Sequence, residues 1–112
     1  MVTYINPNKI DDLCNEIGSD NLPILLDIFL GELNEYQAEL TVVDETSELR
    51  LGDISHALKS SAASFGAENL CQIATGIDAQ VKSGCKINTV ENRESILSSL
   101  EKTIRAYGSL MD

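Results

Sequence analysis

The amino-acid sequence predicts an all-α protein, an antiparallel four-helix bundle with a short accessory N-terminal helix. Apolar residues recur every three or four positions along four long stretches, which is the period of a helix with one buried face. No segment shows the sustained alternation of apolar and polar residues that is typical of a β-strand. Two prolines and no tryptophan among 112 residues also favour helices over a β-sandwich.

The accessory helix is expected over residues 6–17. Asn6 can cap its N-terminus, Pro7 suits the first helical position, and Gly18 can end it. Its apolar edge is narrow and consists of Ile10, Leu13, Cys14 and Ile17. A helix this short is not stable alone, so we expect it to lie on a larger element.

A longer second helix is expected to start near Asn21, with Pro23 tolerated in its first turn. Its buried stripe consists of Leu22, Leu25, Leu26, Phe29, Leu33, Tyr36 and Leu40. Ile24 and Ile28 fall roughly on the other side, and two aliphatic residues on a polar face need a cover. We expect the first helix to cover most of that area, and a docking partner is the alternative.

The third helix is predicted to begin at residue 47 or 48 and to stop at Gly66, a natural left-handed C-cap. Its buried stripe consists of Leu51, Ile54, Leu58, Ala62 and Phe65. His56, the only histidine of the chain, projects from nearly the opposite side. Its neighbours on that outer face are Gly52, Asp53, Lys59, Ser60 and Ala63. The imidazole is therefore expected on an open surface, where a large partner can reach it.

Two further helices complete the predicted bundle. One is expected over residues 67–83, ended by Gly84, with an inward stripe of Leu70, Ile73, Ala74, Ile77 and Val81. The other is expected to open at a capping box formed by Asn88 and Glu91. Its inward stripe consists of Val90, Leu97, Leu100, Ile104, Tyr107 and Met111. The third and fourth helices must form a hairpin, because their connection is very short.

Charge and cysteine content exclude several classes of function. The formal net charge of −10 argues against a nucleic-acid or anionic-membrane surface, since either would need clustered Lys and Arg. Three widely spaced cysteines without a CxxC pair indicate free thiols, and a single histidine argues against a zinc site. Because no signal-peptide or membrane-spanning run is found, we expect a cytoplasmic protein.

A lone histidine in a soluble domain is usually a surface residue without a role, but the surroundings of His56 favour one. Histidine is the side chain whose neutral, nucleophilic form is well populated near pH 7. Lys59, one turn later, supplies a positive charge where an anion attached to the ring would sit. Ser60 offers a hydroxyl donor. A nucleophile, a cation and cleared space together suit a histidine that carries a phosphoryl group.

The same helix carries a short motif, HALKSSA at residues 56–62, followed by Gly66 and Leu70. This motif resembles H-x-L-K-G-x-A, the signature of HPt domains, which are the histidine-containing phosphotransfer modules of phosphorelays. It departs from the signature at Ser60, where glycine is usual; serine still admits close approach and adds a donor. The stretches EIGSDNLPILLDIFLGEL and ISHALKSSAASFGAENL further resemble the stand-alone HPt proteins of quorum-sensing relays.

The resemblance implies a single HPt phosphotransfer domain over residues 1–112, with His56 as the phosphoacceptor. The phosphoryl group would come from the receiver-domain aspartate of a hybrid sensor kinase and pass to the receiver aspartate of a response regulator. Lys59 would stabilise charge on the phosphoryl oxygens, and Ser60 could contact them. Because the Mg²⁺ of such a reaction belongs to the receiver domain, we expect no metal or cofactor in this chain. A monomer is expected.

The sequence also lacks the glycine-rich GxxxxGK[ST] loop that binds nucleotide phosphates. We therefore expect a carrier and not a kinase, since the protein could not phosphorylate itself from ATP. Two other functions remain open. The first is a helical adaptor for other proteins, with Ile24 and Ile28 in its docking surface and His56 incidental. The second is a hydrolase, which has less support because Cys71 and Cys85 lack a recognisable nucleophile motif.

Overall fold

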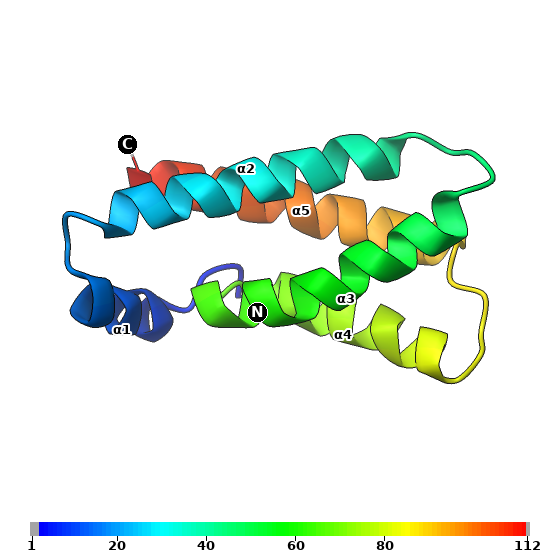
Figure 1. Cartoon of the computed structure of the whole chain (residues 1–112), viewed down its shortest axis with the longest axis horizontal. Coiled ribbons are helices and arrows are strands. Elements are labelled where there is room, and N and C mark those ends of the chain that lie inside the picture. Colours follow the sequence, from blue (N-terminus) through cyan, green and yellow to red (C-terminus); the bar gives the residue numbers. More distant parts are fainter. Residues whose placement is uncertain (1–2, 112) are drawn as a thin grey trace.

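A computed structural model describes residues 3–111 and folds them into five α-helices without a β-strand (Figure 1). The helices are α1 (Pro7–Ile17), α2 (Leu22–Thr41), α3 (Ser47–Phe65), α4 (Glu68–Lys82) and α5 (Val90–Met111). The four long helices lie side by side, with α3 packed mainly on α4 and α2 mainly on α5. This is the predicted all-α bundle with a short accessory helix. Within the described range, no helix has the length and apolarity needed to cross a membrane.

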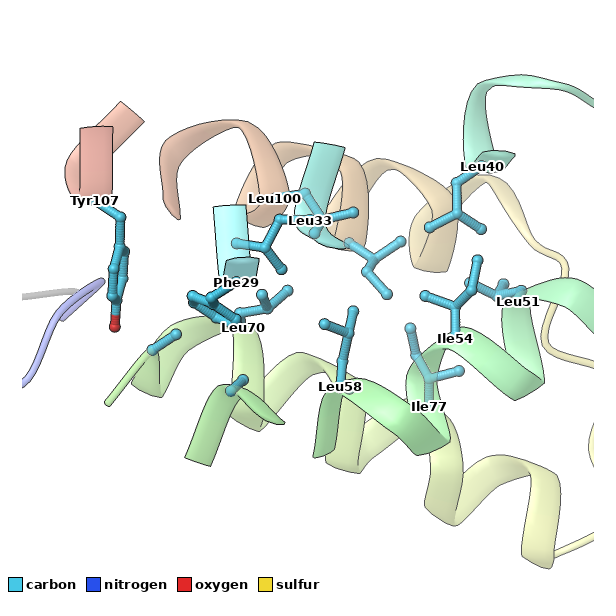
Figure 2. Close-up of a cluster of buried hydrophobic side chains, with 14 of the residues drawn as sticks. Phe29, Leu33, Leu40, Leu51, Ile54, Leu58, Leu70, Ile77, Leu100 and Tyr107 are labelled. Carbon is cyan, nitrogen blue, oxygen red and sulfur yellow. The ribbon is translucent and has the colours of Figure 1, made fainter. Parts of the chain in front are cut away.

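The hydrophobic core runs along the centre of the bundle and takes side chains from all four long helices (Figure 2). The large side chains at its centre are fully buried, and include Phe29, Leu33 and Leu40 of α2, Leu51 and Leu58 of α3, Leu70 and Ile77 of α4, and Ile96, Leu100 and Tyr107 of α5. Because α3 contributes a continuous buried stripe, its opposite face is fixed toward solvent. That orientation determines where His56 can point.

Aromatic side chains close the end of the core near the α3–α4 turn. The rings of Phe29 and Phe65 stack with their centroids 4.2 Å apart, and Tyr107 meets Phe29 edge to face at 5.3 Å. The Tyr107 hydroxyl donates a hydrogen bond of 2.6 Å to the carbonyl of Phe65. Burial, the larger cause, and the nearby Glu68 carboxylate both raise the pKa of Tyr107, so its phenol stays protonated. The last residue of α3 is thereby tied to α5.

The accessory helix α1 is anchored on the α3–α4 turn. The Asn6 side chain caps α1 by accepting from the backbone N–H of Asn8 at 3.0 Å, as predicted. The Asn6 backbone N–H donates to the carbonyl of Gly66 at 2.8 Å, and its side-chain amide donates to Glu68 at 2.6 Å. Gly66 adopts the predicted left-handed conformation, with φ at 80°. The turn that ends α3 is therefore also the platform for α1.

The connection between α4 and α5 is held by Glu48, in the first turn of α3. Its carboxylate accepts hydrogen bonds from the backbone N–H groups of Ile87 at 2.6 Å and Asn88 at 2.7 Å. The predicted capping box at Asn88 is wrong, because Thr89 caps α5 by accepting from the backbone N–H of Asn92 at 3.1 Å. With Glu48 fixing the backbone at Asn88, the cap of α5 lies one residue beyond the predicted one, and the helix begins at Val90.

The prediction that α1 covers Ile24 and Ile28 is wrong, since these side chains are 62% and 63% exposed. The anchoring at Asn6 and Gly66 draws α1 toward the end of α3 instead. The two isoleucines line a shallow groove of about 290 Å³ together with Ile17, Asn21 and Leu25.

Two valines predicted to face inward are also exposed. Val90, the first residue of α5, is 71% exposed, and Val81 near the end of α4 is 43% exposed. Helix ends reach past the neighbours that would bury them, and Ile87 and Ile96 occupy the core there instead. The Met111 side chain, also predicted inward, lies outside what the structure describes.

Candidate functional site

His56 lies near the middle of α3, on the face turned away from the core. Its side chain is 69% exposed, whereas Ile54 and Leu58 on the opposite face are 4% and 0% exposed. The exposed position is the one that the helical pattern predicts. An imidazole held here by a rigid helix can be reached by a partner without rearrangement of the bundle.

A buried carboxylate that the sequence reasoning missed lies beside the imidazole. Asp78 of α4 leaves only 7% of its side chain exposed, and its Oδ1 is 3.3 Å from His56 Nδ1. Because a carboxylate can only accept hydrogen bonds, this contact requires a hydrogen on Nδ1. The α3–α4 hairpin brings these two residues together across its interface.

Two lysines pair with the other oxygen of the same carboxylate. Lys59 Nζ of α3 lies 2.8 Å from Asp78 Oδ2, and Lys82 Nζ, one turn farther along α4, lies 2.9 Å from it. The hydrogen bonds from Lys59, then from Lys82, hold the pKa of Asp78 well below its usual range, with a smaller contribution from His56. The hydrogen bond to Asp78 in turn raises the pKa of Lys82. At neutral pH the cluster therefore carries one buried anion and two cations.

This pairing changes the view of Lys59 that the sequence suggested. Lys59 was expected to offer its charge directly to an anion on the ring, but its ammonium group contacts Asp78 instead. The Lys59 side chain is 32% exposed and the Lys82 side chain is 63% exposed, so both can still be reached from solvent. An anion arriving at His56 therefore meets two cations that are already held together.

Ser60, the other residue singled out from the sequence, does not join the cluster. It is exposed, and its carbonyl accepts a hydrogen bond of 3.1 Å from the Ser64 hydroxyl. Among the contacts of residues 3–111, none links its side chain to His56, Lys59 or Asp78. Its contact with a phosphoryl group stays a prediction. Within the same range, no three His, Cys, Asp or Glu side chains gather as a metal site would require.

A groove of about 450 Å³ opens beside His56, between the start of α3 and the end of α4. Its apolar lining includes Leu49 and Val81, which are 70% and 43% exposed. Gly52 lies in the same lining, and a Cβ there would come within 3.5 Å of the Ile87 side chain. The groove combines an apolar floor with the charged cluster at one edge, an arrangement that suits the surface of another protein.

Cys85 also lines this groove, which the sequence did not predict. Cys71 lies on the other side of Lys59, where its thiol donates to the Lys59 carbonyl at 3.5 Å. Among the described contacts neither thiol is hydrogen-bonded to the His56 ring. The hydrolase alternative therefore gains no nucleophile–base pair from the structure.

Comparison with known proteins gives a consistent result. The Hpt domain family model matches residues 24–107, a range that includes His56 and Asp78. A protein of Vibrio cholerae named phosphorelay protein LuxU is 48% identical over 114 residues, covering 99% of both chains. The proteins of that name from Vibrio harveyi and Vibrio vulnificus are 47% and 45% identical; the alignments cover 94% and 92% of this chain and 93% and 90% of the relatives. No solved structure gives a significant match. The chain belongs to the Hpt domain family.

Proposed function

We propose that this protein is a histidine phosphocarrier of a two-component phosphorelay that serves quorum sensing. His56 accepts a phosphoryl group from the receiver-domain aspartate of a hybrid sensor kinase and passes it to the receiver aspartate of a response regulator. Membership of the Hpt family and up to 48% identity to proteins named phosphorelay protein LuxU support this role. The observation that carries the proposal is the exposed imidazole of His56 beside two lysines on the matched domain.

The chemistry needs one nucleophilic nitrogen and no proton transfer. His56 Nε2 attacks the phosphorus of the aspartyl phosphate; the N–P bond forms, the P–O bond breaks, and the receiver carboxylate leaves with the electron pair. The ring keeps the hydrogen on Nδ1, which faces Asp78 at 3.3 Å. The reverse steps return the phosphoryl group to a second receiver and regenerate neutral His56. The protein contributes mainly positioning and charge stabilisation, as is general for phosphoryl transfer.

Lys59 supplies the charge stabilisation in this proposal. Its Nζ shares the Asp78 carboxylate with Lys82, so it can turn toward the phosphoryl oxygens while Lys82 keeps Asp78 paired. Ser60, exposed four residues after His56, adds a hydroxyl donor near the phosphoryl oxygens. Both roles depend on a phosphoryl group being present.

The partners supply what this chain lacks. The receiver domains bring the aspartate and its Mg²⁺, and a sensor kinase brings the ATP site, so the carrier works without a metal or cofactor of its own. The groove beside His56 offers an apolar surface next to the charged cluster for such a receiver. We propose that the protein acts in the cytoplasm. We also propose that it acts as a monomer, because each transfer needs one exposed histidine and one receiver.

A transfer assay tests the proposal. The full-length protein is mixed with a receiver domain carrying ³²P on its aspartate, with ATP withheld, and the product is treated with acid and with alkali. We expect label that moves onto this chain, is lost in acid and survives alkali, as phosphohistidine does. Absence of transfer from several receivers, including those of LuxU-type relays, would contradict the proposal.

His56→Gln provides the matching variant, because glutamine keeps size and polarity at an exposed position. The bundle should stay folded, as judged by circular dichroism and thermal unfolding, while the label disappears completely. Residual stoichiometric labelling of a folded His56→Gln protein would show that His56 is not the acceptor. Incubation with ATP alone should label neither protein.

A helical adaptor is the second candidate, favoured by the exposure of Ile24 and Ile28. An adaptor would bind its partner equally well with His56→Gln and would lose binding with Ile24→Ser and Ile28→Ser combined. Pull-down with the same receiver domains distinguishes the two functions. For a carrier, the substitution that matters is the other one: in the transfer assay, label should be lost in His56→Gln and retained in the Ile24→Ser, Ile28→Ser variant.

A further inference from the structure

We infer that Asp78 is a positioning residue that holds the His56 ring with its hydrogen on Nδ1, so that Nε2 presents its lone pair to the phosphoryl group. The inference rests on the proposed phosphocarrier function and adds to it the residue that selects the reacting nitrogen. Without such a partner, an exposed imidazole can rotate and exchange its hydrogen between both nitrogens.

The carboxylate is suited to this task because it is itself immobile. Asp78 follows Ile77, which is 2% exposed, and lies one turn after Ala74, which is 0% exposed, so its backbone is fixed in the α3–α4 interface. Lys59 and Lys82 both bind Oδ2, which leaves Oδ1 facing the ring. A rigid carboxylate can fix the orientation of a mobile ring, whereas a mobile carboxylate could not.

The same contact favours the transfer step through charge. As Nε2 bonds to phosphorus, positive charge grows on the imidazole, and the Asp78 carboxylate 3.3 Å from Nδ1 stabilises it. The ring nitrogen that binds phosphorus lies on the side away from Asp78, which limits repulsion between the carboxylate and the phosphoryl group. Lys59 and Lys82 reduce this repulsion further. Asp78 therefore acts through His56 and does not touch the phosphoryl group.

Nuclear magnetic resonance can read the position of the hydrogen directly, because His56 is the only histidine of the chain. With ¹⁵N-histidine incorporated in the full chain, one pair of ring nitrogens is observed at a pH where the ring is neutral. We expect the Nδ1–H form to dominate in the unaltered protein and the Nε2–H form to gain in Asp78→Ala. A dominant Nε2–H form in the unaltered protein, or no change in Asp78→Ala, would overturn the inference.

Transfer kinetics provide the second measurement. Asp78→Asn keeps the shape of the side chain, and we expect the transfer rate at saturating receiver to fall about 10- to 100-fold, the range typical of removing a partner that orients a metal-bound histidine. The receiver concentration for half-saturation should change little, because Asp78 is buried. Asp12→Asn is the matched control: Asp12 is exposed on α1, lies outside the groove beside His56 and contributes the same charge. Equal rates for Asp78→Asn and Asp12→Asn would overturn the inference.

These measurements separate the inference from the function on which it rests. An unaltered protein that accepts no phosphoryl group would overturn the phosphocarrier function, whatever the ring nitrogens show. An unaltered protein that accepts the group while its hydrogen lies on Nε2 would overturn the role of Asp78 alone. If Asp78→Asn does not fold, the spectrum of the unaltered protein still tests the inference, because it shows which ring nitrogen carries the hydrogen.

Discussion

His56 owes its chemical environment to two residues on another helix. Asp78 and Lys82 of α4 complete a cluster to which α3 contributes only His56 and Lys59. Burial would by itself raise the pKa of Asp78, and the two lysines more than reverse this effect. The carboxylate thus stays ionised and available to the ring throughout the neutral range.

At this scale we predict that Lys59 and Lys82 act together. Lys59→Ala should slow phosphoryl transfer by about tenfold, less than the loss of a fully enclosed donor, because the side chain is 32% exposed. Lys82→Ala should have a smaller effect, since that side chain is 63% exposed. The transfer rate of the double variant should fall by a larger factor than the product of the two single-variant factors, because each lysine can replace the other on Asp78.

Single-turnover rates with a phosphorylated receiver measure this coupling. Lys102→Ala on α5 serves as the control, because Lys102 is exposed and lies outside the cluster. Purely multiplicative effects of the two substitutions would mean that the lysines act independently. An unchanged rate for Lys59→Ala would remove Lys59 from the proposed mechanism.

The sequence predicts one half of this site and misses the other for a geometric reason. The periodicity of α3 places His56 and Lys59 on one outer face, because neighbours within a helix follow from spacing alone. Asp78 lies 22 positions after His56 and reaches it only through the packing of α3 on α4. One signal was present: Asp78 directly follows the buried Ile77 and stands four residues before Lys82, a spacing that favours an ion pair.

At the scale of elements, the helix boundaries follow closely from caps and turns. Asn6, Gly18 and Gly66 cap the helix ends as predicted, because capping depends on the local conformation of the chain. The contacts of α1 could not be predicted in the same way. Its position depends on the hydrogen bonds of Asn6 to Gly66 and Glu68, and these leave Ile24 and Ile28 uncovered.

The turn at Gly66 provides a prediction for this scale. A Cβ at Gly66 would lie 2.8 Å from Lys9 Cβ and 3.1 Å from the Asn6 carbonyl oxygen, with φ at +80°. Gly66→Ala should therefore lower the free energy of unfolding by about 2–4 kcal/mol, since it adds a clash to backbone strain. Urea denaturation measures this change.

Gly84 offers a matched control, because it has the same φ of +80° with nothing within 4 Å of an added Cβ. Gly84→Ala should cost about 1 kcal/mol, the cost of the left-handed conformation alone. Equal losses for the two variants would mean that α1 does not pack tightly on the turn. Hydrogen exchange of α1 should rise in Gly66→Ala and stay unchanged in Gly84→Ala.

At the scale of the whole molecule, lowering the pH has two opposing effects on the stability of the fold. The chain has 18 Asp and Glu against 8 Lys and Arg, so acidification from neutral pH first reduces repulsion as the net charge falls toward the pI near 4.3. Two carboxylates oppose this trend in stronger acid. Hydrogen bonds from the Thr46 hydroxyl and backbone lower the pKa of Asp44, and the lysines lower that of Asp78.

These two shifts predict a steep loss of stability in acid. A carboxylate whose pKa is lower in the folded chain than its ordinary value of 3.8 favours folding above that pH, and this contribution disappears as pH falls toward the folded-state pKa. The free energy of unfolding should therefore fall below about pH 4, and Asp78→Asn should lose less over the same range because the group that titrates is gone. Urea denaturation from pH 7 to pH 2 tests this, with Asp53→Asn as the control for charge alone. Parallel curves for Asp78→Asn and the unaltered chain would mean that the lysines do not hold Asp78 in solution as they do in the structure.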